Sequence, residues 1–282
     1  MATDIDDPAQ QTLLERMAEA SRARAAVAKA ACGTAEMRHR AEGSIAPPPL
    51  ILSDVGFDLI AEVKRRSPSE GTLAGPSVLS VDQAQAYVSG GATALSVLTE
   101  PSEFNGSVAD LQSVVAAVTP APVIRKDFLV SPYQVLESRA CGAAGVLLIA
   151  AILDHNLLQD MLDCALGLGM FVLMEVFDRV QLDYCVPVLE SVGPAFDGNH
   201  CRILLGVNCR DLRSLKVNLE NFAEFAPHLP TTMPWVAESG ITEAAQVRAL
   251  SGLGYRLALV GTSLMRSRDP AAAVRALCMA GQ

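Results

Sequence analysis

The amino-acid sequence predicts an α/β protein, a TIM (β/α)8 barrel with an N-terminal helical extension. From residue 57 onward, eight short apolar runs alternate with longer helical patterns, at intervals of roughly 23–35 residues. Alternating strands and helices favour a parallel sheet, and eight such units are the number found in this barrel. The competing architecture is a doubly wound open sheet, but no Gly-x-Gly-x-x-Gly motif follows the first run. We therefore assign residues 51–282 to one barrel domain.

Each apolar run has the length of a buried strand and is bounded by polar or turn-forming residues. The predicted strands are Phe57–Lys64, Ala92–Leu98, Pro122–Asp127, Gly145–Ala150, Met170–Val176, Arg202–Asn208, Pro234–Ser239 and Leu257–Gly261. Glycines stand just before three of them, at Gly90-Gly91, at Cys141-Gly142, and at Gly167 and Gly169. Glycine often ends a helix because it adopts the left-handed conformation, so these positions mark the ends of the preceding helices.

Residues 1–50 differ from the rest and are assigned to the helical extension. Leu13, Met17, Ala20 and Val27 recur at helical spacing, which predicts an amphipathic helix. Residues 46–49 (APPP) then predict a stiff connector. We expect this extension to pack on the barrel, over one of its mouths.

The composition fits a globular enzyme and disfavours several other classes of protein. Half of the 282 residues are hydrophobic and 19% are charged, which argues against disorder. The net charge of −9 disfavours nucleic acid or an anionic membrane as a partner, and no apolar run approaches transmembrane length. The seven cysteines include no Cys-x-x-Cys pair, so we expect reduced thiols in a cytoplasmic protein. A small anionic ligand would need positive side chains concentrated in one place.

Residues 60–71 (IAEVKRRSPSEG) form the most informative stretch of the chain. Glu62 and Lys64 stand two residues apart at the end of a predicted strand, so their side chains share one face. Buried charges are costly unless they are paired or used in function. A single pair of this kind is also explained by a solvated ion pair. The other strand ends decide between these two interpretations.

In a TIM barrel the reacting groups lie at the C-terminal ends of the strands. Polar residues stand at several of these ends in the sequence: Ser96, Thr99, Lys126, Asp127, Glu175, Asn208, Arg210 and Glu238. The turns after the seventh and eighth strands contain Ser239-Gly240 and Gly261-Thr262. Loops at this place often bind phosphate through backbone N–H groups. The pattern predicts a site for a phosphorylated anion.

The sequence contains no recognisable cofactor or metal motif. We expect His39, His155, His200 and His228 in helices or loops, away from the strand ends, so no metal-ligand set is predicted. Lysine and carboxylates must then supply the acid–base chemistry. A lysine enclosed by apolar walls or other cations has a depressed pKa, which suits a general acid near neutral pH.

Several segments, in their order along the chain, resemble the indole-3-glycerol phosphate synthase family. These segments are residues 60–71, 90–100 (GGATALSVLTE), 104–107 (FNGS), 124–128 (IRKDF), 132–134 (PYQ), 205–212 (LGVNCRDL), 237–241 (AESGI) and 260–265 (VGTSLM). The resemblance covers roughly residues 57–270. It implies closure of the indole ring of 1-(2-carboxyphenylamino)-1-deoxyribulose 5-phosphate, with loss of carbon dioxide and water and without a cofactor, in tryptophan biosynthesis.

The resemblance also implies roles for five catalytic residues. Lys126 would protonate the ribulose carbonyl or the departing hydroxyl, and Glu175 would be the general base of the dehydration. Glu62 would hydrogen-bond the reacting hydroxyls and position Lys126. Lys64 would pair with the anthranilate carboxylate, and Asn208 would hold Glu175 or the region of the ring nitrogen.

The remaining residues implied by the resemblance bind the substrate. Phe104 and Phe128 would flank the aryl ring, and Glu238 is also assigned to substrate binding. The phosphate would be surrounded by Ser67, Arg210, Ser239, Gly240, Gly261 and Thr262. The expected partner is therefore an anionic phosphosugar, with association to other tryptophan-pathway enzymes as a further expectation.

The chain departs from the family pattern at five places, one of which is that its first 50 residues lack the usual basic pattern. Phe177 stands where histidine is common, Cys209 where a polar residue is usual, and Glu70 where lysine is frequent. The segment between Glu175 and Asn208 is longer than usual, and its prolines and Asp-Gly-Asn run predict a surface loop at the N-terminal face of the barrel. Three alternatives stay open: a paralogue in a specialised indole pathway, a sugar-phosphate isomerase, and a catalytically silent barrel that acts as a partner subunit.

Overall fold

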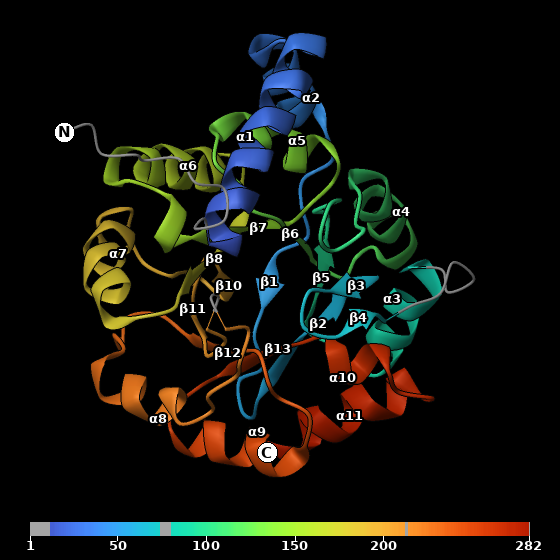
Figure 1. Ribbon diagram of the computed structural model, residues 1–282, viewed down its shortest axis with the longest axis vertical. Helices are drawn as coiled ribbons and strands as arrows, with labels where there is room; N and C mark the ends of the chain where they lie inside the picture. Colours follow the sequence, from blue (N-terminus) through green and yellow to red (C-terminus); the bar gives the residue numbers. More distant parts are fainter. Residues whose placement is uncertain (1–11, 74–79, 212–213, 282) are drawn as a thin grey trace, which may run out of the picture.

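The computed structural model describes residues 12–73, 80–211 and 214–281. Eight parallel strands close into a barrel, in the order β2, β5, β6, β7, β8, β11, β12 and β13, with helices around it (Figure 1). These strands are β2 Asp58–Val63, β5 Ala94–Leu98, β6 Val123–Lys126, β7 Gly145–Ile149, β8 Phe171–Val176, β11 Ile203–Asn208, β12 Trp235–Glu238 and β13 Leu257–Val260. Each lies inside a run predicted from the sequence, so the TIM barrel is confirmed.

The helices of the barrel follow its strands in turn. They are α3 Ser80–Ser89, α4 Val108–Val118, α5 Pro132–Ala140, α6 His155–Gly167, α7 Arg179–Ser191, α8 Asn221–Phe225, α9 Ala244–Gly252, α10 Thr262–Met265 and α11 Pro270–Ala280, with 3-10 helices η1 Ala150–Ile152 and η2 Ala226–His228. Five begin after a side chain that accepts a first-turn N–H: Ser107, Ser131, Asp154, Asp178 and Asp269. Within the described chain, no helix has the length and apolar composition needed to cross a bilayer.

The alternation of side chains along each strand builds two cores. On β8, Val172 and Met174 pack outward against the helices, whereas Phe171 and Leu173 fill the barrel interior. Glu175 continues the inward series one step further along the strand, at its C-terminal end. A regular two-residue period thus delivers a buried carboxylate to the barrel mouth.

A small antiparallel sheet covers the N-terminal end of the barrel. It consists of β1 Leu50–Ile51, β10 His200–Cys201 and β9 Phe196–Asp197, with Leu50 opposite Cys201. Both of these residues are buried and belong to the cluster that fills the barrel interior. The predicted position of the long segment before the sixth strand is correct, but the segment forms a hairpin instead of a plain loop. His200 accordingly lies in a strand, contrary to the prediction.

Two helices form the N-terminal extension, α1 Leu13–Ala31 and α2 Thr34–Gly43. The sequence predicted the first helix but not all of the residues on its buried face. Met17, Ser21 and Ala25 are buried, whereas Val27 is 71% exposed. The spacing of apolar residues could not predict that Ser21 is buried, because serine is polar. Its hydroxyl oxygen is buried in the structure and accepts a hydrogen bond from Gln134. The second helix, which packs Met37 and Ala41 against α5, was not predicted.

The three predicted helix ends at glycine have the expected conformation. Gly91, Gly142 and Gly169 follow α3, α5 and α6, and their φ angles are 96°, 87° and 72°. A side chain would strain the backbone in this region, so glycine allows each chain segment to turn from helix to strand.

Candidate active site

A cavity of about 670 Å³ opens at the C-terminal ends of the strands. All fourteen residues that the sequence assigned to the site line it: Glu62, Lys64, Ser67, Phe104, Lys126, Phe128, Glu175, Asn208, Arg210, Glu238, Ser239, Gly240, Gly261 and Thr262. The β3–β4 hairpin, Arg66–Ser67 paired with Gly71–Thr72, lies in the connection that follows β2. The structure therefore brings together residues as far apart in sequence as Glu62 and Thr262, which are 200 positions apart.

Lys126 occupies the centre of a buried charge cluster on the cavity floor. Its Nζ lies 2.8 Å from Glu238 Oε2 and 3.4 Å from Glu175 Oε2. Asn208 Nδ2 donates to the same Glu175 oxygen at 3.0 Å. The four side chains come from β6, β8, β11 and β12, and they form one connected network.

The surrounding carboxylates raise the pKa of Lys126. Burial alone would lower that pKa, but the negative charges of Glu238, Glu175 and Glu62 outweigh it. The predicted depressed pKa is therefore wrong. The sequence placed a lysine in an apolar strand, and it did not reveal that three other strands direct carboxylates toward its ammonium group. Lys126 is a fixed cation at neutral pH.

Glu238 is the unusual acid of the cluster. Burial raises its pKa to about 8, and the negative charge of Glu175 adds to the shift, while Lys126 opposes it. Among the described residues, its buried Oε1 has no hydrogen-bond partner. Gly206 on β11 makes room for this carboxyl group, because any side chain at that position would collide with Oε1.

Glu62 and Lys64 form an ion pair of 2.6 Å at the end of β2. Burial alone would raise the pKa of Glu62, but Lys64 and Lys126 outweigh burial and lower it. The predicted common face is thus correct. The hydrogen bonds that the structure records for Lys126 go to Glu175 and Glu238, so Glu62 influences it through charge.

A polar region lies beside the turns after β12 and β13. Arg210 donates to Ser69 Oγ at 3.1 Å, and Ser239 Oγ donates to Asn208 Oδ1 at 2.8 Å. Ser239 and Gly240 have φ angles of 74° and 77°, which place two successive residues in the left-handed region. The turn after β12 is thereby held close to Asn208 and open to the cavity.

Two aromatic rings form a wall of the cavity. The ring centroids of Phe104 and Phe128 lie 6.1 Å apart, and their planes are inclined by 38°. They come from the connections that follow β5 and β6. A flat apolar group could lie against this wall while its polar substituents reach the charged floor.

The cavity also contains residues that the sequence interpretation missed. Leu13 from α1 and Phe177 after β8 line it, and Arg266 pairs with Glu70 at 2.7 Å. Arg266 directly follows a segment used for the resemblance, and the helix prediction treated Leu13 only as a packing residue. Phe177 was noted as a departure, without a predicted contact. Among the described residues, no group of three His, Cys, Asp or Glu could hold a metal ion.

Comparison with known proteins gives strong sequence matches along nearly the whole chain. Residues 14–277 match the family model of indole-3-glycerol phosphate synthase. The enzyme of that name from Mycolicibacterium smegmatis is 43% identical over 277 residues, covering 96% of this chain and 95% of that protein. The one from Mycobacterium tuberculosis is 42% identical over 277 residues, with the same coverage.

Solved structures of other proteins share the fold at much lower sequence identity. 3-Hexulose-6-phosphate synthase from Salmonella typhimurium has a TM-score of 0.60 and 14% identity, covering 79% of this chain and 98% of that one. Thiamine phosphate pyrophosphorylase from Pyrococcus furiosus has a TM-score of 0.56 and 17% identity, covering 79% and 95%. At these identities the likeness concerns the barrel architecture alone.

Proposed function

We propose residue roles from the premise that the chain belongs to the indole-3-glycerol phosphate synthase family. The protein is a carbon–carbon lyase of tryptophan biosynthesis. It closes the indole ring of 1-(2-carboxyphenylamino)-1-deoxyribulose 5-phosphate and releases carbon dioxide and water. The observation that carries the assignment of roles is the buried cluster of Lys126 with Glu175 and Glu238 on the cavity floor.

Lys126 acts on the oxygen of the ribulose carbonyl. During ring closure the aryl carbon that bears the carboxylate attacks this carbonyl carbon, and negative charge develops on the oxygen. The Lys126 ammonium group stabilises that charge, as preorganised donors do in other enzymes, and transfers a proton to the oxygen. Its raised pKa supports this role, because it keeps the group positively charged until the oxygen becomes basic.

Decarboxylation and dehydration then complete the ring. The carboxylate leaves as carbon dioxide, which returns the bonding electrons to the aryl ring. Lys126 first regains a proton from water in the cavity and then protonates the departing hydroxyl group, which leaves as water. Glu175 accepts the proton lost from the carbon beside the ring nitrogen and returns it to Lys126, 3.4 Å away, for the next turnover. Asn208 orients Glu175 for this step through its 3.0 Å hydrogen bond.

The other cavity residues hold the substrate in place. Lys64 pairs with the anthranilate carboxylate, while Glu62 and Glu238 hydrogen-bond the hydroxyl groups. Phe104 and Phe128 contact the aryl ring. The phosphate binds near Arg210 and the turns after β12 and β13, with Ser67, Ser239, Gly240, Gly261 and Thr262 around it. The positive groups concentrated here support binding of a dianion in a protein whose net charge is −9.

We place the protein in the cytoplasm and propose that it associates there with other enzymes of the pathway. Its seven described cysteines are free thiols, which supports a reducing compartment. The intact charge cluster favours an active enzyme over a silent partner subunit, because a silent barrel has no need for buried charges. Phe177, Cys209 and Glu70 keep a specialised indole pathway as the second candidate setting for the same chemistry.

The assay of this function follows indole fluorescence after mixing the protein with the aryl-ribulose phosphate. We expect the wild type to form product and Lys126→Ala to lose ~10²–10⁴ in rate, as is usual for a general acid. Lys29→Ala, at an exposed position of α1, is the matched control and should keep full activity. Circular dichroism verifies that each variant is folded.

A Lys126→Ala variant that kept more than about a tenth of the wild-type rate, a loss below ~1.4 kcal/mol, would contradict its role. Absence of product with the wild type would instead favour the silent barrel.

A further inference from the structure

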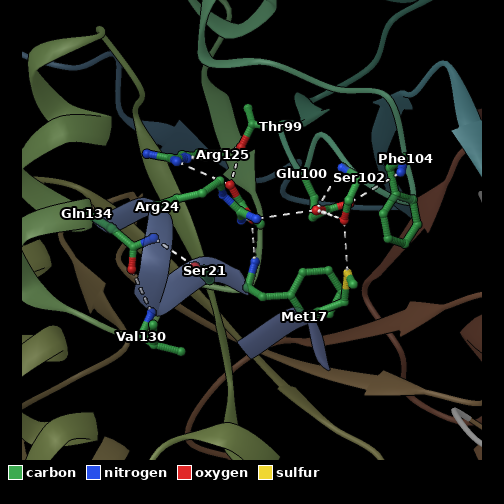
Figure 2. A network of polar contacts seen from close by, with 12 residues as sticks. Met17, Ser21, Arg24, Thr99, Glu100, Ser102, Phe104, Arg125, Val130 and Gln134 are labelled. Atoms are coloured by element: carbon green, nitrogen blue, oxygen red, sulfur yellow. Dashed lines mark hydrogen bonds and ion pairs between the residues drawn. The ribbon is translucent and has the colours of Figure 1, made fainter. Parts of the chain in front are cut away.

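A polar network joins the N-terminal helix to two loops at the barrel mouth (Figure 2). Arg24 on α1 reaches Asp127 Oδ1 at 2.8 Å through Nη2 and Glu100 Oε1 at 3.3 Å through Nη1. Glu100 follows β5 and Asp127 follows β6, and both carboxylates are buried. A single guanidinium group of the extension thus connects the ends of two adjacent barrel strands.

Glu100 organises the loop that carries Phe104. Its carboxylate accepts backbone N–H groups from Ser102 at 2.9 Å, Glu103 at 2.7 Å and Phe104 at 3.3 Å. The loop therefore folds around this carboxylate, and the position of the Glu100 side chain determines where the Phe104 backbone lies. Arg24 is the positive partner that the described residues provide for Glu100.

Asp127 plays the corresponding part for Phe128, but with additional support. Its Oδ1, the oxygen bound by Arg24, also accepts the Phe128 N–H at 2.8 Å. Its Oδ2 accepts from Thr99 at 2.7 Å and from Arg125 at 3.2 Å. Loss of Arg24 would leave Asp127 with a second cation, so the strand that bears the neighbouring lysine should stay in place.

We propose that Arg24 is a positioning residue that sets the separation of Phe104 and Phe128 and thereby the fit of the aryl ring. The inference rests on the proposed function, in which these rings contact the aminobenzoate part of the substrate. Through Glu100 and Asp127 the guanidinium group fixes both ring-bearing loops to one point on α1. The residues proposed around the phosphate lie on β3 and at the ends of β11, β12 and β13, and none of them takes part in the contacts described for Arg24, Glu100 and Asp127.

Two other contacts keep α1 on the barrel without Arg24, so its substitution need not release the helix. Gln134 donates to Ser21 Oγ at 2.8 Å, and the Tyr133 hydroxyl donates to the Ala28 carbonyl at 2.9 Å. Both partners on the barrel side belong to α5. Substitution of Arg24 should therefore change the positions of the two loops that carry Phe104 and Phe128, while α1 stays attached to the barrel.

The kinetic test compares Arg24→Met with Arg24→Lys and with the matched control Arg22→Met, an exposed position on the same helix. We expect Arg24→Met to raise KM three- to tenfold, the range for loss of an aromatic contact. kcat should change by less than about twofold, since Lys126 keeps its partners. Inhibition by inorganic phosphate should be unchanged. The KM of Arg24→Lys should lie between that of the wild type and that of Arg24→Met. Equal effects on KM and on phosphate inhibition, or an equal effect of Arg22→Met, would overturn the proposal.

A double-mutant cycle with Phe104→Ala separates positioning from general loosening. If Arg24 acts through this ring, Arg24→Met should have little further effect on KM in the Phe104→Ala background. Additive effects of the two substitutions would show that Arg24 acts elsewhere, and the proposal would fall.

Binding of anthranilate, followed by its fluorescence, tests the aryl pocket without turnover. The wild type should bind this probe three- to tenfold more tightly than Arg24→Met, again by the strength of one aromatic contact. Equal affinities, or no binding to the wild type at all, would overturn the proposal. If the proposed function itself is wrong, the wild type forms no indole product. In that case the comparison of anthranilate binding still tests whether Arg24 shapes an aryl pocket.

Discussion

At the scale of single residues, burial and neighbouring charge give two glutamates opposite properties. Burial and Glu175 raise the pKa of Glu238 to about 8, whereas Lys64 and Lys126 outweigh burial and lower the pKa of Glu62. The Glu238 carboxylate therefore binds a proton more tightly than an ordinary glutamate does, and the Glu62 carboxylate binds one less tightly. The same residue type thus has two different proton affinities within one site.

The raised pKa of Glu238 predicts a pH-dependent stability. The folded protein binds this proton up to about pH 8, whereas an unfolded glutamate releases it near ~4.3. The contribution to stability is therefore complete below the unfolded pKa and is lost as pH rises through the folded pKa. The Tm of Glu238→Gln, which cannot ionise, should accordingly rise relative to that of the wild type between pH 5 and 8, by about 2–4 °C for each kcal/mol. Thermal unfolding across this range checks it, and a constant difference in Tm would contradict the assignment.

Glu62→Gln and Lys64→Ala should fail in different ways, although the two side chains form one ion pair. Lys64 is proposed to hold the substrate carboxylate, a contact already present before reaction, so its loss should mainly raise KM. Glu62 acts on the reacting hydroxyls and on the charge of Lys126, so its loss should mainly lower kcat, by ~10-fold or more. Steady-state kinetics on both variants measures this, after thermal unfolding has shown that neither is destabilised by the unpaired partner. The same change in kcat and KM in both variants would refute the separate roles.

The sequence predicted which residues meet in the cavity better than it predicted their electrostatic states. Strand-end position alone placed Lys126, Glu175 and Asn208 together, because parallel strands bring their ends to one rim. The pKa of Lys126 depends on which carboxylates point toward it, and that is a property of barrel closure. Arg24 was invisible for a related reason. Its partners lie 76 and 103 residues away, and no local pattern links them.

At the scale of elements, the hairpin β9–β10 stabilises the barrel without entering the site. It pairs with β1 at the N-terminal end, where Leu50 and Cys201 are buried, whereas the cavity lies at the opposite end. Replacing residues 194–200 by a short Gly-Ser linker should therefore expose apolar surface, at ~1.5–3 kcal/mol for a large side chain. We expect a Tm lower by several degrees, at about 2–4 °C for each kcal/mol, with kcat/KM unchanged. A scan of unfolding and a kinetic assay of the folded variant measure both, and a tenfold loss of kcat/KM at normal stability would refute this division.

The strands were predictable as elements because most of their side chains are apolar and form short runs bounded by polar or turn-forming residues. The helical extension was less so, since its buried face contains Ser21 and its second helix has only Met37 and Ala41 as buried residues. A helix that rests on another helix needs a narrower apolar stripe than one that covers a sheet. The hairpin was read as a loop because its strands have two residues each, too few for a periodic signal.

At the scale of the whole molecule, catalysis is expected to depend on the chain alone. The proposed chemistry uses an ammonium group and carboxylates, and no motif in the sequence provides a metal-binding set. Dialysis against EDTA should therefore leave kcat and KM unchanged within about twofold, which is below ~0.5 kcal/mol. Activity that disappears on dialysis and returns with zinc or magnesium would show that the proposal lacks a component.

The small sheet at the N-terminal end also determines the route by which substrate enters and product leaves the barrel. Among the described residues, Leu50 and Cys201 close that end, so the cavity opens at the other end, where α1 and the connections after the strands line it. Indole-3-glycerol phosphate must back out along the path by which its precursor came in. Bound product therefore blocks entry of the next substrate, so product must dissociate from the cavity before another turnover can begin.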